Sequence, residues 1–191
     1  MRIVLMGPPG AGKGTQAAII SQALTIPHIS TGDIFRANVT EGTALGIEAK
    51  RYMDAGEYVP DGVTNAMVRD RLAQSDCATG FLLDGYPRTV EQVGELAAML
   101  GSAGQKLDKV VELTADTDEV VTRLLKRAAE QGRSDDTEDV IRRRLEVYGA
   151  QTAPLTAMYR DQGLLVQVDG LGSVEAVTSR VFVALGIAPN A

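Results

Sequence analysis

The chain of 191 residues contains little cysteine, few aromatic residues and no long apolar run. Its one cysteine, Cys77, excludes a disulfide framework and a zinc site made of several thiolates. Aromatic residues make up only 4% of the chain, which leaves few platforms for stacked nucleic-acid bases. No stretch reaches the roughly 18 apolar residues that span a membrane, and no secretory signal is visible. The sequence therefore predicts a cytoplasmic protein without structural zinc and without membrane binding.

Positive charge is also in deficit, because 19 Lys and Arg face 25 Asp and Glu and the net charge is −6. Such an acidic chain is poorly suited to bind nucleic-acid polymers or anionic lipid. The basic residues are unevenly divided into 14 Arg and 5 Lys. The guanidinium group of Arg binds phosphate through two parallel hydrogen bonds, which the ammonium group of Lys does not do. We therefore expect a locally positive cleft for small polyanions in an acidic protein.

What the sequence does contain is an alternation of short apolar runs with longer stretches of helical pattern. The apolar runs are continuous, which is typical of strands buried on both faces of a parallel sheet. They cover residues 3–6, 26–29, 81–83, 110–113 and 164–168. The helical stretches cover residues 13–24, 61–73, 90–100, 117–130, 137–159 and 173–185. The alternation predicts an α/β fold with a doubly wound, five-stranded parallel sheet flanked by helices, and ligands at the carboxyl ends of the strands.

Two stretches do not fit this alternation. Residues 30–59 have a helical pattern interrupted by glycines and contain no strand of their own, which predicts a small helical insertion after the second strand. Residues 128–136 are polar and short, and they predict a loop between two helices.

A glycine-rich loop, Gly7-Pro8-Pro9-Gly10-Ala11-Gly12-Lys13-Gly14-Thr15, follows the first predicted strand and opens the first predicted helix. Its glycines let successive backbone N–H groups point into one concavity, and the helix N-terminus adds partial positive charge. Lys13 then places a cation on the β and γ phosphates of a nucleotide. Gly14 stands where the phosphate-loop pattern has Ser or Thr, so Thr15 is the nearest hydroxyl for Mg²⁺. The alternative is a glycine-rich turn that merely precedes a helix.

A second polar segment follows the apolar run at residues 81–83. Asp84 ends this predicted strand and is well placed to hold Mg²⁺ through water, while Arg88 returns to the same edge of the sheet. The alternative is that Asp84 and Gly85 only form a turn.

Helical geometry separates the arginines in the second half of the chain. At about 100° per residue, Arg144 lies on the apolar face of its helix, whereas Arg142 and Arg143 lie outside it. A charge on the packed face needs an anion, so Arg144 is the functional candidate and the other two are expected in solvent or in surface ion pairs. Arg123 and Arg127 lie one turn apart, where like charges repel unless they share a phosphate. The alternative is two solvated basic residues.

Taken in order along the chain, these motifs resemble the adenylate kinase family. The resemblance rests on the glycine-rich loop and four further segments, and it covers essentially the whole chain. The four segments are Ser30-Thr31-Gly32-Asp33 with Arg36, Asp84-Gly85-Tyr86-Pro87-Arg88-Thr89 with Gln92, Arg133-Ser134-Asp135-Asp136, and Arg142 to Tyr148 followed by Thr152-Ala153-Pro154-Leu155. The resemblance implies a monomeric kinase that catalyses the reversible, Mg²⁺-dependent reaction of ATP and AMP to two ADP. It also implies a cis peptide bond before Pro87.

The same resemblance implies a division into three parts. The core would comprise residues 1–29, 60–122 and 137–191, the AMP-binding insertion residues 30–59, and the lid over ATP residues 123–136. A lid this short has no room for the zinc-binding subdomain of longer relatives. It also covers the adenine of ATP less fully, which predicts a less strict selectivity for that donor.

The site residues that the resemblance implies fall into overlapping groups. ATP would be bound by Gly10, Ala11, Gly12, Lys13, Gly14, Thr15, Arg123, Arg127 and Gly172. AMP would be bound by Thr31, Arg36, Glu57, Tyr58, Val59, Gly85, Tyr86, Pro87, Arg88, Gln92, Arg133 and Arg144. Catalysis would depend on the cations at the transferring phosphoryl group, Lys13, Arg88, Arg123, Arg133 and Arg144. Mg²⁺ would be held through water by Asp84, with Thr15 as a further candidate.

Three alternatives remain open. A UMP/CMP kinase has the same architecture, but Thr31 and Gln92 favour adenine as the acceptor base. A GTPase-type switch is disfavoured, because no Asn-Lys-x-Asp motif occurs and Gly14 alters the metal site. A nucleotide sensor without activity would not need the arginine cluster. His28, the only histidine, is expected to be a packing or edge residue without a functional role.

Overall fold

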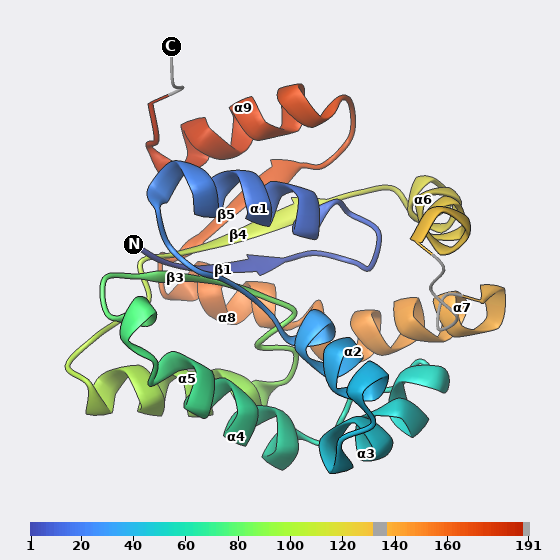
Figure 1. Ribbon diagram of the computed structural model, residues 1–191. Coiled ribbons are helices and arrows are strands. Elements are labelled where there is room, and N and C mark those ends of the chain that lie inside the picture. Colours follow the sequence, from blue (N-terminus) through green and yellow to red (C-terminus); the bar gives the residue numbers. More distant parts are fainter. Residues whose placement is uncertain (132–136, 189–191) are drawn as a thin grey trace.

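One parallel sheet of five strands forms the centre of the molecule (Figure 1). The computed structural model describes residues 1–131 and 137–188 of the chain. The strands are β1 (Arg2–Met6), β2 (His28–Ser30), β3 (Phe81–Asp84), β4 (Lys109–Thr114) and β5 (Leu165–Asp169). They are hydrogen-bonded in the order β2-β3-β1-β4-β5, and every neighbouring pair is parallel. The predicted α/β fold with a doubly wound, five-stranded parallel sheet is confirmed.

The helices surround this sheet. They are α1 (Lys13–Leu24), α2 (Thr31–Glu41), α3 (Ala44–Asp54), α4 (Asp61–Leu72), α5 (Val90–Ser102), α6 (Thr117–Gln131), α7 (Glu138–Val147), α8 (Leu155–Asp161) and α9 (Val174–Leu185), with a 3₁₀ turn η1 (Ser75–Cys77) and a π-helical segment η2 (Tyr148–Thr152). Within the two described ranges, none of these helices is both long and apolar enough to cross a bilayer.

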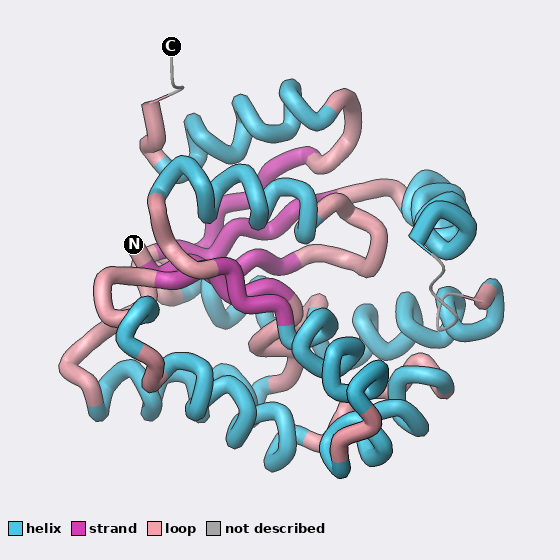
Figure 2. The backbone as a smooth tube through the Cα atoms, viewed as in Figure 1, coloured by secondary structure: helices cyan, strands magenta, loops and turns pink. Residues whose placement is uncertain are grey.

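Helices cover both faces of the sheet, which explains why its strands are apolar at consecutive positions (Figures 1 and 2). On one face, α1 and α9 pack over Ile3, Leu5 and Val111. On the other face, α4, α5 and α8 pack over Val4 and Leu83. The strands are therefore packed on both sides, and the polar residues that follow them lie at one edge of the sheet.

The insertion expected at residues 30–59 contains α2 and α3, which lie beyond the edge strand β2 (Figure 1). The two helices share a small core with Phe35, Ala49 and Val59. At Gly46 a Cβ atom would lie 2.1 Å from the carbonyl oxygen of Asn38, so only glycine permits this backbone-to-backbone packing. The division of the chain into core, insertion and lid remains a prediction.

Residues 137–159 do not form the single helix that the sequence predicts. The segment is instead divided into α7, the π-helical segment η2 and α8. Pro154, directly before α8, has no N–H to donate, and its ring would clash with the carbonyl group four residues earlier in a continuous helix. The second strand likewise begins at His28 instead of residue 26, because Pro27 has no N–H to donate to the sheet.

Candidate active site

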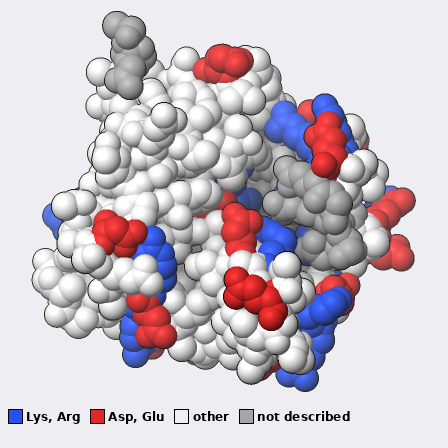
Figure 3. Space-filling view, viewed as in Figure 1, with Lys and Arg blue, Asp and Glu red and all other residues white. Residues whose placement is uncertain are grey.

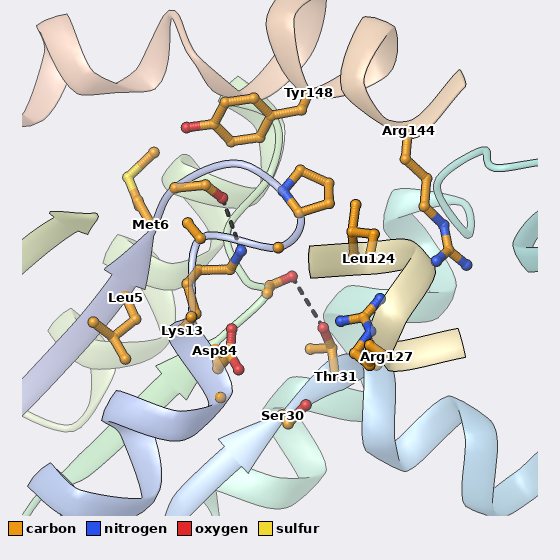
Figure 4. A pocket seen from close by; sticks show the side chains of 18 of the residues that line it. Leu5, Met6, Lys13, Ser30, Thr31, Asp84, Leu124, Arg127, Arg144 and Tyr148 are labelled. Carbon is orange, nitrogen blue, oxygen red and sulfur yellow. Dashed lines mark hydrogen bonds between the residues drawn. The ribbon is translucent and has the colours of Figure 1, made fainter. Parts of the chain in front are cut away.

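The carboxyl ends of the strands open into a cavity of about 1090 Å³. Its walls come from the glycine-rich loop, from α2 and the end of the insertion, from the loop after β3, and from α6 and α7 (Figure 4). These segments meet because a parallel sheet brings the carboxyl ends of its strands to one edge. All the described site candidates except Tyr86 line this cavity. Arg133 lies outside the described residues.

The cavity is richer in positive charge than the chain as a whole. Its described lining carries seven Lys and Arg side chains against five Asp and Glu, although the chain has a net charge of −6. The cations are Lys13, Arg36, Arg88, Arg123, Lys126, Arg127 and Arg144. Figure 3 shows basic atoms inside the hollow near the centre of the view, with acidic side chains beside them. This is the locally positive cleft that the excess of Arg predicts.

The glycine-rich loop turns sharply between β1 and α1. Gly10 and Gly12 have φ angles of 84° and 92°, which residues with a Cβ atom rarely adopt. At Gly10 a Cβ atom would also lie 2.9 Å from the carbonyl oxygen of Val120 on α6. The turn brings the N-terminus of α1 to the cavity, where it favours a bound anion.

Lys13 is the first residue of α1, and its ammonium group lies inside the loop (Figure 4). Nζ donates to the carbonyl groups of Gly7 and Pro8 at 2.8 and 2.9 Å. Burial lowers the pKa of Lys13 from 10.5 to about 8, the carboxylate of Asp84 opposes this shift, and nearby arginines add to it. A bound polyphosphate would reverse the shift, because an anion favours the charged form of the amine.

Asp84 ends β3 and faces both Lys13 and His28. Its Oδ2 atom lies 3.6 Å from Nε2 of His28. Burial raises the pKa of Asp84, but the neighbouring His28 and the charges of Lys13 and Arg88 outweigh burial and hold the pKa below its ordinary value. Asp84 is therefore a buried carboxylate that stays ionised.

The loop after β3 fixes Arg88 at the cavity. The peptide bond between Tyr86 and Pro87 is cis, as the resemblance implies. Nε of Arg88 donates to the carbonyl of Gly85 at 2.7 Å, and the Arg88 N–H donates to Oε1 of Gln92 at 2.7 Å. These bonds fix the backbone of Arg88 and the Nε atom of its guanidinium group, and the residue lines the cavity.

Buried polar side chains connect this acceptor loop (residues 85–92) to its neighbours. Nε2 of Gln92 donates to Oδ1 of Asp61 at 2.6 Å, and the Thr89 hydroxyl donates to the other oxygen of the same carboxylate at 2.8 Å. Thr31, at the start of α2, donates to the carbonyl of Gly85 at 3.0 Å (Figure 4). The loop is thus positioned by residues from α4, α5 and the insertion.

Tyr86 differs from the other described candidates, because its side chain does not line the cavity. The side chain is completely buried, and its hydroxyl donates to Oδ1 of Asn65 at 2.9 Å. Burial raises the pKa of Tyr86, so the phenol stays neutral. The side chain holds the acceptor loop to α4, and the AMP-binding role predicted for Tyr86 stays a prediction, which its side chain does not support.

The insertion contributes a cation and an aromatic ring. Nη2 of Arg36 forms an ion pair with Oδ1 of Asp33 at 2.5 Å, within α2. The Tyr58 ring faces the Arg88 guanidinium, whose Cζ lies 4.9 Å from the ring centroid. Val59 is buried in the core of the insertion and also lines the cavity.

The arginines of α7 lie as helical geometry predicts. Arg142 and Arg143 are exposed in surface ion pairs, and Arg143 meets Glu57 of the insertion at 2.6 Å. Arg144 is half-buried and lines the cavity, with Nη2 3.5 Å from the carbonyl of Met53 (Figure 4). The Glu57 side chain therefore connects the insertion to α7. The family resemblance implies only that Glu57 binds AMP, and it does not predict this ion pair.

α6 carries Arg123 and Arg127 into the cavity. Nε of Arg123 pairs with Glu119 at 2.9 Å, and Nη1 donates to the carbonyl of Gly170 at 3.2 Å. Gly172, with φ of 107°, lines the same region. The apolar face of α6 packs against α7, so these two arginines are directed at the cavity.

His28 and Thr152 are among the cavity-wall residues that the sequence reasoning does not assign to the site. Nε2 of His28 is buried without a hydrogen-bond partner among the described residues, and it faces Asp84. Thr152 is buried in η2 and hydrogen-bonds with Tyr58 and Arg88. Its segment contributes to the family resemblance, but no pattern in the sequence shows that its hydroxyl faces the acceptor loop.

Comparison with known proteins agrees with this geometry. A family model described as adenylate kinase matches residues 5–164. A protein named adenylate kinase from Nocardioides sp. is 63% identical over 190 residues, with 100% of both chains covered. A protein of the same name from Kocuria rhizophila is 64% identical over 184 residues, which cover 96% of this chain and 98% of that protein. Another from Leptospira biflexa is 54% identical over 180 residues, which cover 94% of this chain and 97% of that protein. The chain therefore belongs to the adenylate kinase family.

Proposed function

We propose that this chain catalyses the reversible, Mg²⁺-dependent transfer of the γ-phosphoryl group of ATP to AMP, which gives two ADP. The observation that carries the proposal is that one cavity joins two cationic phosphate sites. The glycine-rich loop with Lys13 forms one of them, and Arg36 with Arg88 forms the other. A kinase acting between two nucleotides needs both, whereas a nucleotide sensor or a GTPase-type switch needs only the first. The name shared by the relatives supports the same reaction, and the comparisons give no support to a UMP/CMP kinase.

On the donor side, the proposal assigns the phosphates of ATP to the glycine-rich loop and the N-terminus of α1. The assigned residues are Gly10, Ala11, Gly12, Lys13, Gly14 and Thr15. Arg123 and Arg127 bring charge from α6, and Gly172 is assigned to the same donor side. Their common position in the cavity supports this assignment.

On the acceptor side, the proposal assigns AMP to the insertion and the acceptor loop. The assigned residues that line the cavity are Thr31, Arg36, Glu57, Tyr58, Val59, Gly85, Pro87, Arg88, Gln92 and Arg144. Tyr86 is also assigned to this side, and its buried side chain connects the acceptor loop to α4. Arg133 stays a candidate for the bridging phosphates.

The reaction needs little acid–base chemistry, because the phosphate of AMP is already ionised at neutral pH. What the protein must supply is alignment of two polyanions that repel each other and compensation of the charge on the transferring group. Lys13, Arg88, Arg123 and Arg144 all line the cavity and could bring positive charge to that group.

The residues of the cavity fit a magnesium ion. Mg²⁺ prefers one or two carboxylates, water and phosphate oxygens. The ionised Asp84 supplies the carboxylate, and the Thr15 hydroxyl lines the same cavity. When bound there, Mg²⁺ would neutralise charge on the β and γ phosphates.

We also propose that the protein works as a cytoplasmic monomer on soluble ATP, AMP and ADP. In support, one chain supplies both the glycine-rich loop and the acceptor loop of the cavity. Gel filtration coupled to light scattering tests this assignment, and a dimer in which activity depends on concentration would contradict it.

A coupled assay with ATP and each of AMP, CMP, UMP and GMP tests the function. We expect rapid turnover with AMP, loss of turnover when EDTA removes Mg²⁺, and slow or absent turnover with the other monophosphates. Rapid phosphorylation of CMP without phosphorylation of AMP would instead establish the UMP/CMP kinase. Replacement of ATP by GTP or CTP tests the expectation that a short lid relaxes donor selectivity.

A further inference from the structure

Thr152 is a buried hydroxyl at the point where three parts of the cavity wall meet. It is the last residue of η2, and it is 4% exposed. Its Oγ1 donates a hydrogen bond to the backbone carbonyl of Arg88 at 2.9 Å. Oγ1 also lies 2.8 Å from the hydroxyl oxygen of Tyr58 at the end of the insertion. One side chain thus connects η2, the acceptor loop and the insertion.

The direction of both hydrogen bonds follows from the chemistry of the groups. A backbone carbonyl only accepts, so the single hydroxyl proton of Thr152 goes to Arg88. The Tyr58 hydroxyl must then donate its proton to Oγ1 of Thr152. The Tyr58 ring in turn faces the guanidinium group of Arg88, whose Cζ is 4.9 Å from the ring centroid. The three contacts therefore form a closed series, from the Arg88 carbonyl to Thr152, from Thr152 to Tyr58, and from the Tyr58 ring back to the Arg88 guanidinium.

Arg88 is consequently held at four points. Gln92 accepts from its N–H and Gly85 accepts from its Nε, both at 2.7 Å. Thr152 binds its carbonyl, and the Tyr58 ring covers its guanidinium face. We propose that Thr152 is a positioning residue, which fixes Arg88 and Tyr58 for the acceptor phosphate. This rests on the proposed function, because it takes Arg88 as the group that contacts the transferring phosphoryl.

The π-helical turn accounts for the place of Thr152. In η2 the N–H of Ala153 bonds to the carbonyl of Tyr148, five residues earlier, at 2.9 Å. A turn widened in this way carries the residues at its end to a different side of the helix than a continuous α-helix would. The break between α7 and α8 therefore serves to direct the Thr152 hydroxyl at the acceptor loop.

The test compares two substitutions at the same position. Thr152→Val keeps the size of the side chain and removes the hydroxyl, whereas Thr152→Ser keeps the hydroxyl. We expect Thr152→Val to lower kcat with ATP and AMP on the order of 10-fold to 100-fold, because misplacement of a catalytic group is costly. The KM for ATP should change by less than about twofold, because the donor site is untouched. Thr152→Ser should retain most of the turnover.

Thr156→Val is the matched control, because the Thr156 hydroxyl also donates to a nearby backbone carbonyl, that of Ala153 at 2.8 Å, but does not line the cavity. We expect wild-type turnover from it. Should Thr152→Val fail to fold in a thermal melt, Tyr58→Phe keeps the ring and removes the donor, and it should lower kcat in the same direction.

A double-mutant cycle separates positioning from a merely structural role. In an Arg88→Ala background, Thr152→Val should lower kcat much less than in the wild-type background, because the guanidinium group that it positions is gone and only its effect on Tyr58 is left. Equal losses in both backgrounds, no rescue by Thr152→Ser, or wild-type kcat in Thr152→Val would overturn the role of Thr152. A wild-type protein that leaves AMP unphosphorylated would overturn the proposed function itself, so the two failures are distinguishable.

Discussion

The glycine-rich loop and the acceptor loop both follow a buried strand at the same edge of the sheet, yet the first is shaped by its backbone conformation and the second by contacts between side chains. The first is nine consecutive residues whose shape depends on glycine backbone angles and on the N-terminus of α1. The second depends on side chains from remote segments, namely Thr31, Tyr58, Asp61 and Thr152. The comparison teaches that a backbone site can be encoded locally, whereas a side-chain site needs the finished fold.

The difference has a functional consequence. A backbone site is sensitive to an added Cβ atom where the loop is tightly packed, as at Gly10, where the new atom would lie 2.9 Å from the carbonyl oxygen of Val120. A side-chain site is sensitive to the loss of single polar groups, because each buried donor or acceptor that loses its partner costs about 1–3 kcal/mol. Substitutions on the two sides should therefore fail in different ways.

The largest effect is expected from Arg88→Ala on the acceptor side. Loss of the guanidinium group should lower kcat on the order of 10³, since it removes compensation of the charge on the transferring phosphoryl. The KM for ATP should change little, because the glycine-rich loop remains. Steady-state kinetics with both substrates measure this, with a thermal melt as control for folding. Near-normal turnover would contradict the assignment.

The next largest effect is expected from Gly10→Ala on the donor side. A φ of 84° and a carbonyl oxygen 2.9 Å from the new Cβ atom oppose the substitution. We expect the free energy of unfolding to fall by about 1–3 kcal/mol and binding of ATP to weaken. Gly94→Ala is the matched control, because a Cβ there meets nothing within 4 Å. Urea unfolding of both variants measures the difference, and equal stabilities would contradict the role given to Gly10.

A smaller effect is expected in the proton balance of donor binding. Lys13 has a pKa of about 8 in the free protein, so a large part of its population is neutral at pH 8.5 to 9. A bound triphosphate favours the ammonium form, and the complex should take up as much as about one proton there, with the uptake falling toward zero as pH decreases below 8. Calorimetry in buffers of different ionisation enthalpy measures the uptake. Lys13→Arg, which stays charged, should abolish it; persistence of the uptake would point to another group.

The smallest effect is expected from Arg143→Gln. Arg143 pairs with Glu57 on the surface, and exposed ion pairs contribute about 0–1 kcal/mol to stability. We expect kcat to stay near the wild-type value, whereas Arg144→Gln, one residue further and inside the cavity, should lower it. Parallel kinetics of the two variants check this. Equal losses would mean that charge matters on the acceptor side wherever it lies.

Most of the fold follows from local patterns in the sequence. Short apolar runs locate the strands, most clearly β1, β3 and β4, because most residues of these strands are buried and are therefore apolar at consecutive positions. The prediction is wrong where proline acts on a neighbouring element, as at Pro154, which divides the helix expected at residues 137–159. Helical periodicity also separates Arg144 from Arg142 and Arg143 correctly, because the face of a helix is a local property.

By itself, the sequence determined the succession of strands and helices along the chain, the phosphate loop, and the arginines available for a polyanionic substrate, because each depends on residues close together in the chain. Only the tertiary structure decided that the Tyr86 side chain turns into the core, that His28 faces Asp84, and that Thr152 binds Arg88. The contacts of His28 and Thr152 join residues that are far apart in the sequence, and the Tyr86 side chain points away from the cavity that its neighbours line. Their partners become neighbours only when the sheet brings the carboxyl ends of its strands together.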